Sequence, residues 1–177
     1  MTDPVRLLPM TCPRCQNALP AKVDEVAWVC AQCGQGMLLD AAKGLAALEV
    51  HYSAGIQAGK PGSPYWVAQG QAALQRKTFQ GDKSADMVSF WAQPHLFFVP
   101  AITLPLEQVV EVGMRLLRQP PVLTAGPAAP FAPVTVPPDD VRALAEFVVF
   151  AIEAERKDAL KELSIKLELA APELWVL

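Results

Sequence analysis

The four cysteines of this chain all lie near its N-terminus, and their spacing constrains the fold there more than any other feature does. They form two C-x2-C pairs, Cys12-Pro13-Arg14-Cys15 and Cys30-Ala31-Gln32-Cys33. Two such pairs separated by a short spacer can close four thiolates around one ion with tetrahedral geometry. The spacing therefore predicts a structural zinc site whose ligands are Cys12, Cys15, Cys30 and Cys33.

The residues around the cysteines fit the tight turns that such a site needs. Pro13 fixes the backbone of the first turn, and Gly34 can adopt the left-handed conformation that follows the second pair. The first pair is followed by Gln16 and Asn17 instead of glycine, and Asn17 can also adopt that conformation. The sequence thus predicts two similar turns, each directing backbone N–H groups at sulfur.

With Cys12-Pro-Arg-Cys15, Cys30-Ala-Gln-Cys33-Gly34 and the aromatic Trp28 before the second pair, residues 1–36 resemble the zinc-ribbon family. The resemblance covers about the first fifth of the chain. It implies a structural four-cysteine zinc site on two knuckles. It does not imply one function, because members of the family act in transcription, translation, enzyme assembly and protein docking.

Other uses of four cysteines fit the sequence less well. Rubredoxin-type iron has the same ligands, but a longer spacer and a second Cys-Pro, whereas Cys30 is followed by Ala31. A dithiol redox site needs only one pair, and two disulfides suit a secreted protein. A catalytic zinc keeps an open position, which four cysteine ligands do not leave, and the H-x-E or C-x-E arrangement of zinc deaminases is absent.

Composition indicates a soluble protein with a sizeable core. The chain has 177 residues, of which 52% are hydrophobic, and a formal net charge of -3. This charge gives no global attraction to nucleic acid or anionic membranes. The N-terminus lacks the pattern of a signal peptide, and no apolar run approaches the roughly eighteen residues of a membrane-spanning helix. We therefore expect a cytoplasmic protein without a transmembrane segment, in which paired cysteines bind metal.

Residues 37–177 read as an α+β domain with a mainly antiparallel sheet and two helices packed on one face. Short apolar runs predict strands within 26–29, 37–39, 48–52, 65–79, 87–91, 96–99, 163–169 and 174–177, and a turn at 80–82. A meander is the simplest connection for the strands between 65 and 99. Helical periodicity predicts one helix from Pro105 to about 119 and another from Asp139 or Asp140, either of which can cap it, to 152.

Seven prolines fall within residues 120–138, which rules out a helix or a central strand there. This Pro-rich arm is a linker, a wrapping arm or an ordered surface loop. Several aromatic residues lie close to it or on the predicted strands; they are Trp66, Phe90, Trp91, Phe97, Phe98 and Phe131. Alternation along a strand places neighbours on opposite faces, so both sheet faces are apolar. Either the arm packs over the second face, or a partner protein or a second copy covers it.

The sequence contains no recognisable catalytic constellation. His51 and His95 are its only histidines, and each has apolar neighbours, which favours a structural position over a general base. Helix capping accounts for Asp139 and Asp140, and a solvated turn accounts for Glu153 and Glu155. We therefore expect no enzymatic activity.

Two functions are favoured over a third, an enzyme that uses His51 or His95 in an unrecognised pocket. The first is a zinc-ribbon accessory or scaffold subunit that mediates protein–protein contacts in an intracellular assembly. The alternative is a regulator, for example in transcription, that binds nucleic acid. Arg14 at a knuckle tip, and Arg76 and Lys77 beside Phe79, would supply its basic and aromatic surface.

Overall fold

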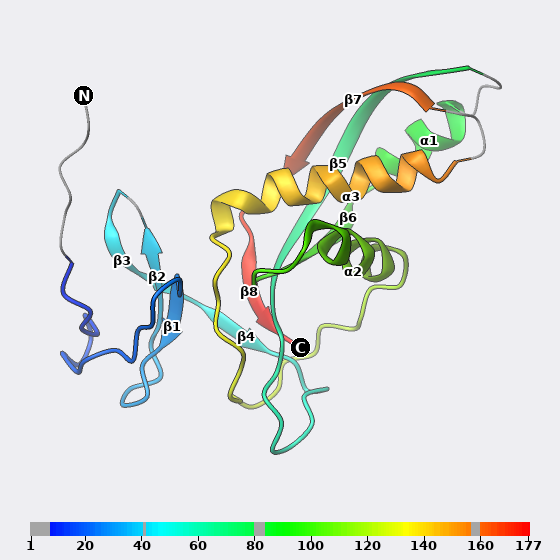
Figure 1. The fold of residues 1–177 in the computed structure, drawn as a ribbon. Coiled ribbons are helices and arrows are strands. Elements are labelled where there is room, and N and C mark those ends of the chain that lie inside the picture. Colours follow the sequence, from blue (N-terminus) through cyan, green and yellow to red (C-terminus); the bar gives the residue numbers. More distant parts are fainter. Residues whose placement is uncertain (1–7, 41, 80–83, 157–159) are drawn as a thin grey trace, which may run out of the picture.

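The computed structural model describes residues 8–40, 42–79, 84–156 and 160–177, and it contains two β-sheets and three α-helices (Figure 1). The predicted α+β class is therefore confirmed. Residues 1–7 of the predicted zinc module and the predicted turn at 80–82 lie outside the described residues. Within the described part of the chain, none of the helices combines the length and the apolar character that crossing a membrane requires.

The N-terminal sheet is a small antiparallel meander. Cys30 and Cys33 lie on the connection between its first two strands, and Cys12 and Cys15 lie in the segment before the first strand. Its strands, in order across the sheet, are β1 (Ala27–Val29), β2 (Gly36–Asp40) and β3 (Gly44–Leu48). The predicted boundary at residue 36 falls at the first residue of β2. A separate small core lies against this sheet, formed by the buried side chains of Cys12, Leu19, Trp28, Cys30 and Met37.

The larger sheet is built around one long strand. Its strands are β4 (Val50–Tyr52), β5 (Pro64–Thr78), β6 (His95–Pro100), β7 (Leu160–Leu169) and β8 (Glu173–Val176). The spatial order is β4-β8-β5-β6, and β7 pairs with β5 beyond the end of β8. All of these pairings are antiparallel except β4 with β8. The predicted meander holds only for β5 and β6, because the C-terminal strands return to pair with β5.

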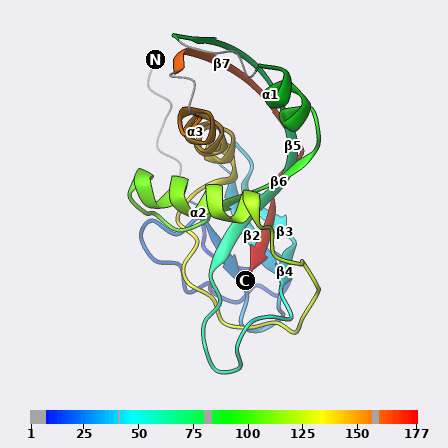
Figure 2. The ribbon, with the colours of Figure 1, turned by 90° about the vertical axis from the view of Figure 1, so that its right-hand side faces the viewer.

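Helices α2 (Leu106–Arg118) and α3 (Val141–Ala154) confirm the two predicted helices. Figure 2 shows both on the concave side of the curved sheet. Sheet residues such as Trp66 and Phe97 share one core with Val148 and Val149 of α3. A short 3₁₀ turn, Pro138–Asp140, precedes α3. Asp140 occupies the N-cap position, but its side chain makes no capping hydrogen bond, so the predicted capping role is wrong.

The strand predicted at 87–91 is instead helix α1 (Ser84–Trp91), the third helix of the fold. Met87 and Trp91, four residues apart, are 1% and 0% exposed, whereas Val88 and Phe90 between them are exposed. Residues four apart share a face in a helix and in a strand, but in a strand Ser89 would share that face too. Ser89 is exposed, which fits the helix. A short apolar run does not distinguish these cases until its tertiary contacts form.

The Pro-rich arm is ordered and joins the two sheets. It forms isolated β-bridges with three separate segments, pairing Ala125 with Ser53, Phe131 with Gly62 and Val134 with Ala27. Val134 is fully buried, and the Val136 carbonyl accepts a 2.7 Å hydrogen bond from the indole of Trp66. The arm therefore satisfies its backbone groups by bridging the N-terminal sheet, the β4 end and the main core.

The chain itself covers most of the predicted aromatic residues. Trp66, Trp91, Phe97 and Phe98 are all no more than 1% exposed. The neighbours Phe97 and Phe98 are thus both buried, although alternation directs them to opposite faces. Phe131 on the arm is half-buried and packs near Tyr52, with 6.2 Å between ring centroids. A partner protein is not needed to cover these strands.

Candidate metal centre

The two cysteine pairs lie on turns with matching hydrogen bonds. In the first, Gln16 N–H donates to Cys12 O at 2.8 Å, and Cys12 N–H donates to Asn17 O at 2.8 Å. In the second, the equivalent bonds run from Gly34 to Cys30 at 2.8 Å and from Cys30 to Gln35 at 2.9 Å. The same spacing, a C-x2-C pair followed by two residues, thus folds into the same turn at both sites.

The left-handed residue follows the second cysteine of each pair. Gly34 has φ 71°, as predicted, and its counterpart Gln16 has φ 61°. The prediction placed this conformation at Asn17, but Asn17 is one position too late for the turn. The left-handed backbone conformation is unfavourable for a residue other than glycine. A 3.2 Å hydrogen bond from the side-chain amide of Gln16 to Pro13 O offsets part of this free-energy cost.

The turns bring the four sulfur atoms together. All four Sγ atoms lie within 4.8 Å of one another, with 3.6 Å between Cys12 and Cys33 and 3.5 Å between Cys15 and Cys30. The four cysteines are free thiols. A tetrahedron of sulfurs around zinc, with Zn–S near 2.3 Å, has edges of about 3.8 Å. The cluster could therefore hold a metal ion, and its size suits four-thiolate coordination.

The surrounding side chains hold this cluster rigidly. Cys12 and Cys30 are 0% and 2% exposed, and Trp28 packs beside them in the small core. The Trp28 indole donates a 2.8 Å hydrogen bond to Glu25, whose carboxylate also accepts from Lys22 N–H at 2.9 Å. The aromatic residue noticed in the sequence therefore fixes the spacer between the two pairs to the sheet.

Backbone N–H groups favour thiolates at this site, while crowding of the sulfurs opposes them. The N–H of Cys33 is the largest influence in lowering the pKa of Cys30 to about 7. The N–H of Gln35 acts in the same direction on Cys33, but burial and the three neighbouring thiols together raise its pKa to about 12. Four thiolates this close together need a cation among them. The donor set therefore fits a metal ion that coordinates sulfur.

Metal uptake is expected to release a proton from Cys33. At pH 8 Cys30, with a pKa of about 7, is already mostly thiolate, whereas Cys33, with a pKa of about 12, is a thiol that must deprotonate to bind. We expect calorimetric titration with Zn²⁺ in buffers of different ionisation enthalpy to detect release of about one proton or more per ion at pH 8. Affinity should rise as the pH rises from 6 to 8, because fewer protons compete for sulfur. An affinity that does not change over this range would contradict thiolate coordination.

Both histidines lie in the described part of the chain, and neither belongs to the cluster formed by the four cysteines. His51 stacks on Trp175 with 4.8 Å between ring centroids, and its ring nitrogens lie 3.9 Å and 3.8 Å from the carboxylates of Glu49 and Glu173. The His95 ring lies 4.3 Å from that of Phe90, whose carbonyl oxygen is 2.8 Å from Nε2. Both histidines thus occupy aromatic surroundings on strands β4 and β6, as the sequence indicated.

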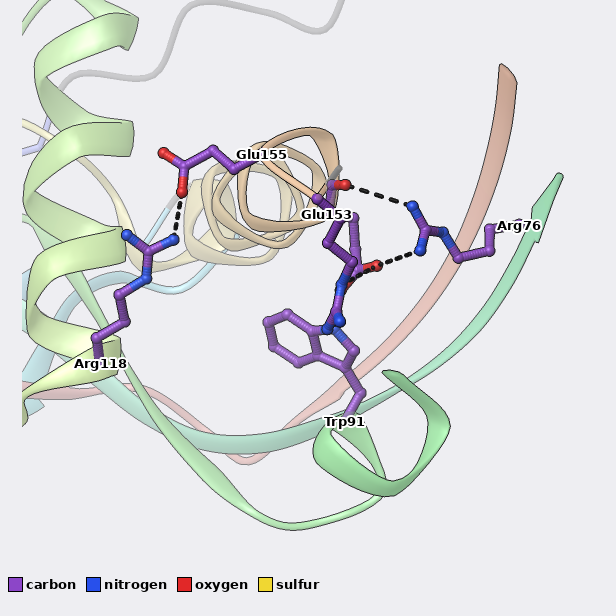
Figure 3. Close-up of polar contacts among 6 residues, drawn as sticks. Arg76, Trp91, Arg118, Glu153 and Glu155 are labelled. Carbon is purple, nitrogen blue, oxygen red and sulfur yellow. Dashed lines mark hydrogen bonds and ion pairs between the residues drawn. The ribbon is translucent and has the colours of Figure 1, made fainter. Parts of the chain in front are cut away.

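A buried charged cluster surrounds Glu153, and it was not predicted from the sequence (Figure 3). Glu153 was predicted to face water, but it is 0% exposed. Its carboxylate accepts hydrogen bonds of 2.8 Å from the indole of Trp91 and from Arg156, and it lies 3.6 Å from Arg76. The cluster ties α1, α3 and β5 together. The only sequence signal was the position of Glu153, one residue after the apolar face of α3.

The predicted basic surface at Arg76 and Lys77 does not form. The Arg76 side chain is 1% exposed and faces Glu153, while Lys77 pairs with Glu162 at 2.7 Å. Phe79 is exposed, and the amine of Lys161 lies 5.5 Å from its ring centroid. Of the three basic residues proposed for nucleic acid, only Arg14 is exposed without a described ion pair. Burial of Arg76 therefore removes one of the three basic residues proposed for nucleic acid.

A groove lies between the metal centre and the Pro-rich arm. It has a volume of about 760 Å³ and is lined on one side by Trp28, Cys30 and Ala31, and on the other by Tyr52, Ala128 and Phe131. Its lining is mainly apolar, with Lys22 and Glu25 at the N-terminal side. The described residues that line the groove include no His or Ser and only one carboxylate, that of Glu25.

Comparison of the chain with family models, with curated proteins and with solved structures found no match. The resemblance to zinc ribbons therefore rests on the two knuckles, their shared hydrogen bonds and the convergence of the four sulfur atoms.

Proposed function

We propose that the four cysteines bind a structural Zn²⁺ ion and that the protein is a non-enzymatic accessory or scaffold subunit that acts through protein contacts. The observation that carries the proposal is the closed four-sulfur cluster. All four positions of a tetrahedral ion would be filled by Cys12, Cys15, Cys30 and Cys33, which leaves none for a substrate or a reactive water. When bound, zinc would supply a cross-link between the two knuckles.

The ribbon and the Pro-rich arm together form the proposed docking face. The Val26 N–H donates to the Val134 carbonyl at 2.8 Å, so the arm is attached to the same sheet that carries the cysteines. The groove between them exposes apolar side chains while the ribbon carries little net charge, and such surfaces are typical of protein contacts. Trp66, Phe97 and Phe98 of the large sheet are buried and do not belong to this face.

The test compares recovery of proteins from native lysate by the intact chain and by variants of the groove. Ala31 and Ala128 are both exposed on its walls, and we expect Ala31→Arg and Ala128→Arg to lose the proteins that the unchanged chain retains at stoichiometric amounts. Ala154→Arg, at an exposed position on α3 away from the groove, makes the same change and should retain them. The proposal is wrong if no protein is retained, or if all three variants retain the same proteins.

A further inference from the structure

Within the part of the chain that the structure describes, the longest open strand edge belongs to β7. Among the described residues, β7 pairs only with β5. Two other edges are covered: β1 by Val134 of the arm, and β4 by Gly126, which donates a 2.7 Å hydrogen bond to Tyr52 O. Residues 71–78 of β5 have no described strand partner on the side of β6, but this edge is shorter than that of β7. Helix α2 packs along β6, where a Cβ atom at Gly113 would lie 3.6 Å from Phe98 O. Strand β3 also has an outer edge without a strand partner in the described ranges, but β3 is half as long as β7.

Hydrogen-bond alternation identifies which main-chain groups point out from β7. Ala170 N–H donates to Gln69 O at 2.8 Å, next to the pair formed by Gly70 and Leu169. In an antiparallel ladder every second residue bonds to the same neighbour, so residues 162, 164, 166 and 168 bond to β5. The N–H and C=O groups of Leu163, Ile165 and Leu167 therefore point outward. The guanidinium of Arg142 donates to Leu167 O, as expected for an outward carbonyl.

We propose that a second copy of this chain pairs with the outer edge of β7, antiparallel and with its two-fold axis at Ser164. In this register Leu163 of each copy lies opposite Ile165 of the other, and their outward N–H and C=O groups bond across the axis. On the exposed face of the sheet, Glu162 of each copy then faces Lys166 of the other copy. The interface therefore holds two such pairs, related by the two-fold axis. A two-fold interface requires such self-complementarity.

Charge selects this register over its neighbours. If one copy is shifted by two residues along the other in one direction, Glu162 of each copy lies opposite Glu168 of the other. These two carboxylates repel each other. Moving them in the other direction places Lys166 opposite Leu160 and removes the ion pairs. In the proposed register Glu162 and Lys166 form a non-hydrogen-bonded pair, in which side chains approach most closely. Opposite charges at such positions stabilise the pairing of two strands.

The paired segment is short, and its ends are defined. Arg142 already occupies Leu167 O at one end, and the register of β5 with β7 shifts between Lys77 and Thr78 near the other. The association is therefore expected to be weak and dependent on concentration, in the range of small transient interfaces. It uses neither the cysteine cluster nor the groove, so it is independent of the proposed function.

Charge reversal tests the register directly. Sedimentation of the full, metal-loaded chain between about 1 and 500 μM should show a monomer–dimer equilibrium. Glu162→Lys alone and Lys166→Glu alone should each weaken it by about tenfold, because both symmetric pairs become repulsive. The double variant restores opposite charges across the axis and should return to within about threefold of the unchanged chain. Lys60→Glu, an exposed charge reversal in a distant turn, should have no effect.

Hydrogen exchange tests the proposed pairing of β7 independently of sedimentation. The amides of Leu163 and Ile165 should become more protected as protein concentration rises, while those of β3 should not. A chain that stays monomeric throughout, or a dimer that both single reversals leave unchanged, overturns the proposal. Protection of these amides only in the presence of another protein also overturns it, because a different strand would then occupy the edge.

Discussion

Replacing Cys30 with serine is expected to abolish stoichiometric metal binding and to unfold the N-terminal sheet. Cys30 is 2% exposed and belongs to a small core that holds few side chains besides the cysteines. Structural zinc contributes about 10 kcal/mol or more to the folding of such modules, so the small core does not suffice without it. Hydrogen exchange should show loss of protection in β1–β3. We expect β5 to remain protected because its core contains no cysteine, although that core does include Ala27 of β1.

Gln32→Ser is the matched control for this change, since Gln32 is exposed in the same turn and contributes no ligand. It should bind one metal ion and keep the exchange pattern of the unchanged chain. Removal of metal with a chelator should reproduce the effect of Cys30→Ser. An N-terminal sheet that stays protected after both treatments would mean that the cysteines do not hold a structural ion.

Replacing Glu153 with alanine is expected to lower the free energy of unfolding by about 3–5 kcal/mol, since it breaks a buried ion pair from one side. Glu153 is fully buried and Arg76 nearly so, and the carboxylate also accepts the Trp91 indole hydrogen bond at 2.8 Å. The change removes the charge that balances Arg76 and disconnects α1 from α3. Urea unfolding followed by tryptophan fluorescence and circular dichroism would measure the loss.

Glu155→Ala is the matched control, two residues along the chain. Its carboxylate pairs with Arg118 in a contact whose side chains are 49% and 53% exposed, so the cost should be no more than about 1 kcal/mol. Joint replacement of Arg76 and Glu153 by Met and Leu should recover part of the lost stability, because apolar residues of similar size can replace a buried pair. Recovery is expected to be incomplete, since the buried Trp91 indole then lacks its acceptor. Equal costs for Glu153→Ala and Glu155→Ala would show that burial of Glu153 has no energetic consequence.

The cysteine cluster was predictable because it depends on local spacing. Each C-x2-C turn is closed by hydrogen bonds between residues four and five positions apart, and Gly34 marks the second turn directly. The two long helices were predictable for a similar reason, since each displays a full amphipathic period. Strand β7 was evident from strict alternation.

The missed features depend on contacts between distant segments. Helix α1 is too short for its period to be distinguished from a strand, and its helical face becomes evident only when Trp91 meets Glu153. The same contact explains why Glu153 is buried despite its charged neighbours. The order of the large sheet depends on C-terminal strands that pair with β5, about a hundred residues away in the sequence. No local pattern encodes that pairing.

The identity and number of metal ions per chain test the central claim most directly. Metal analysis of protein purified under reducing conditions, combined with X-ray absorption at the metal edge, should give one zinc ion per chain with four sulfur neighbours at about 2.3 Å. Iron in its place would contradict the structural-zinc assignment. A zinc ion with fewer than four sulfur neighbours and an oxygen ligand would contradict the closed site on which the non-enzymatic role depends.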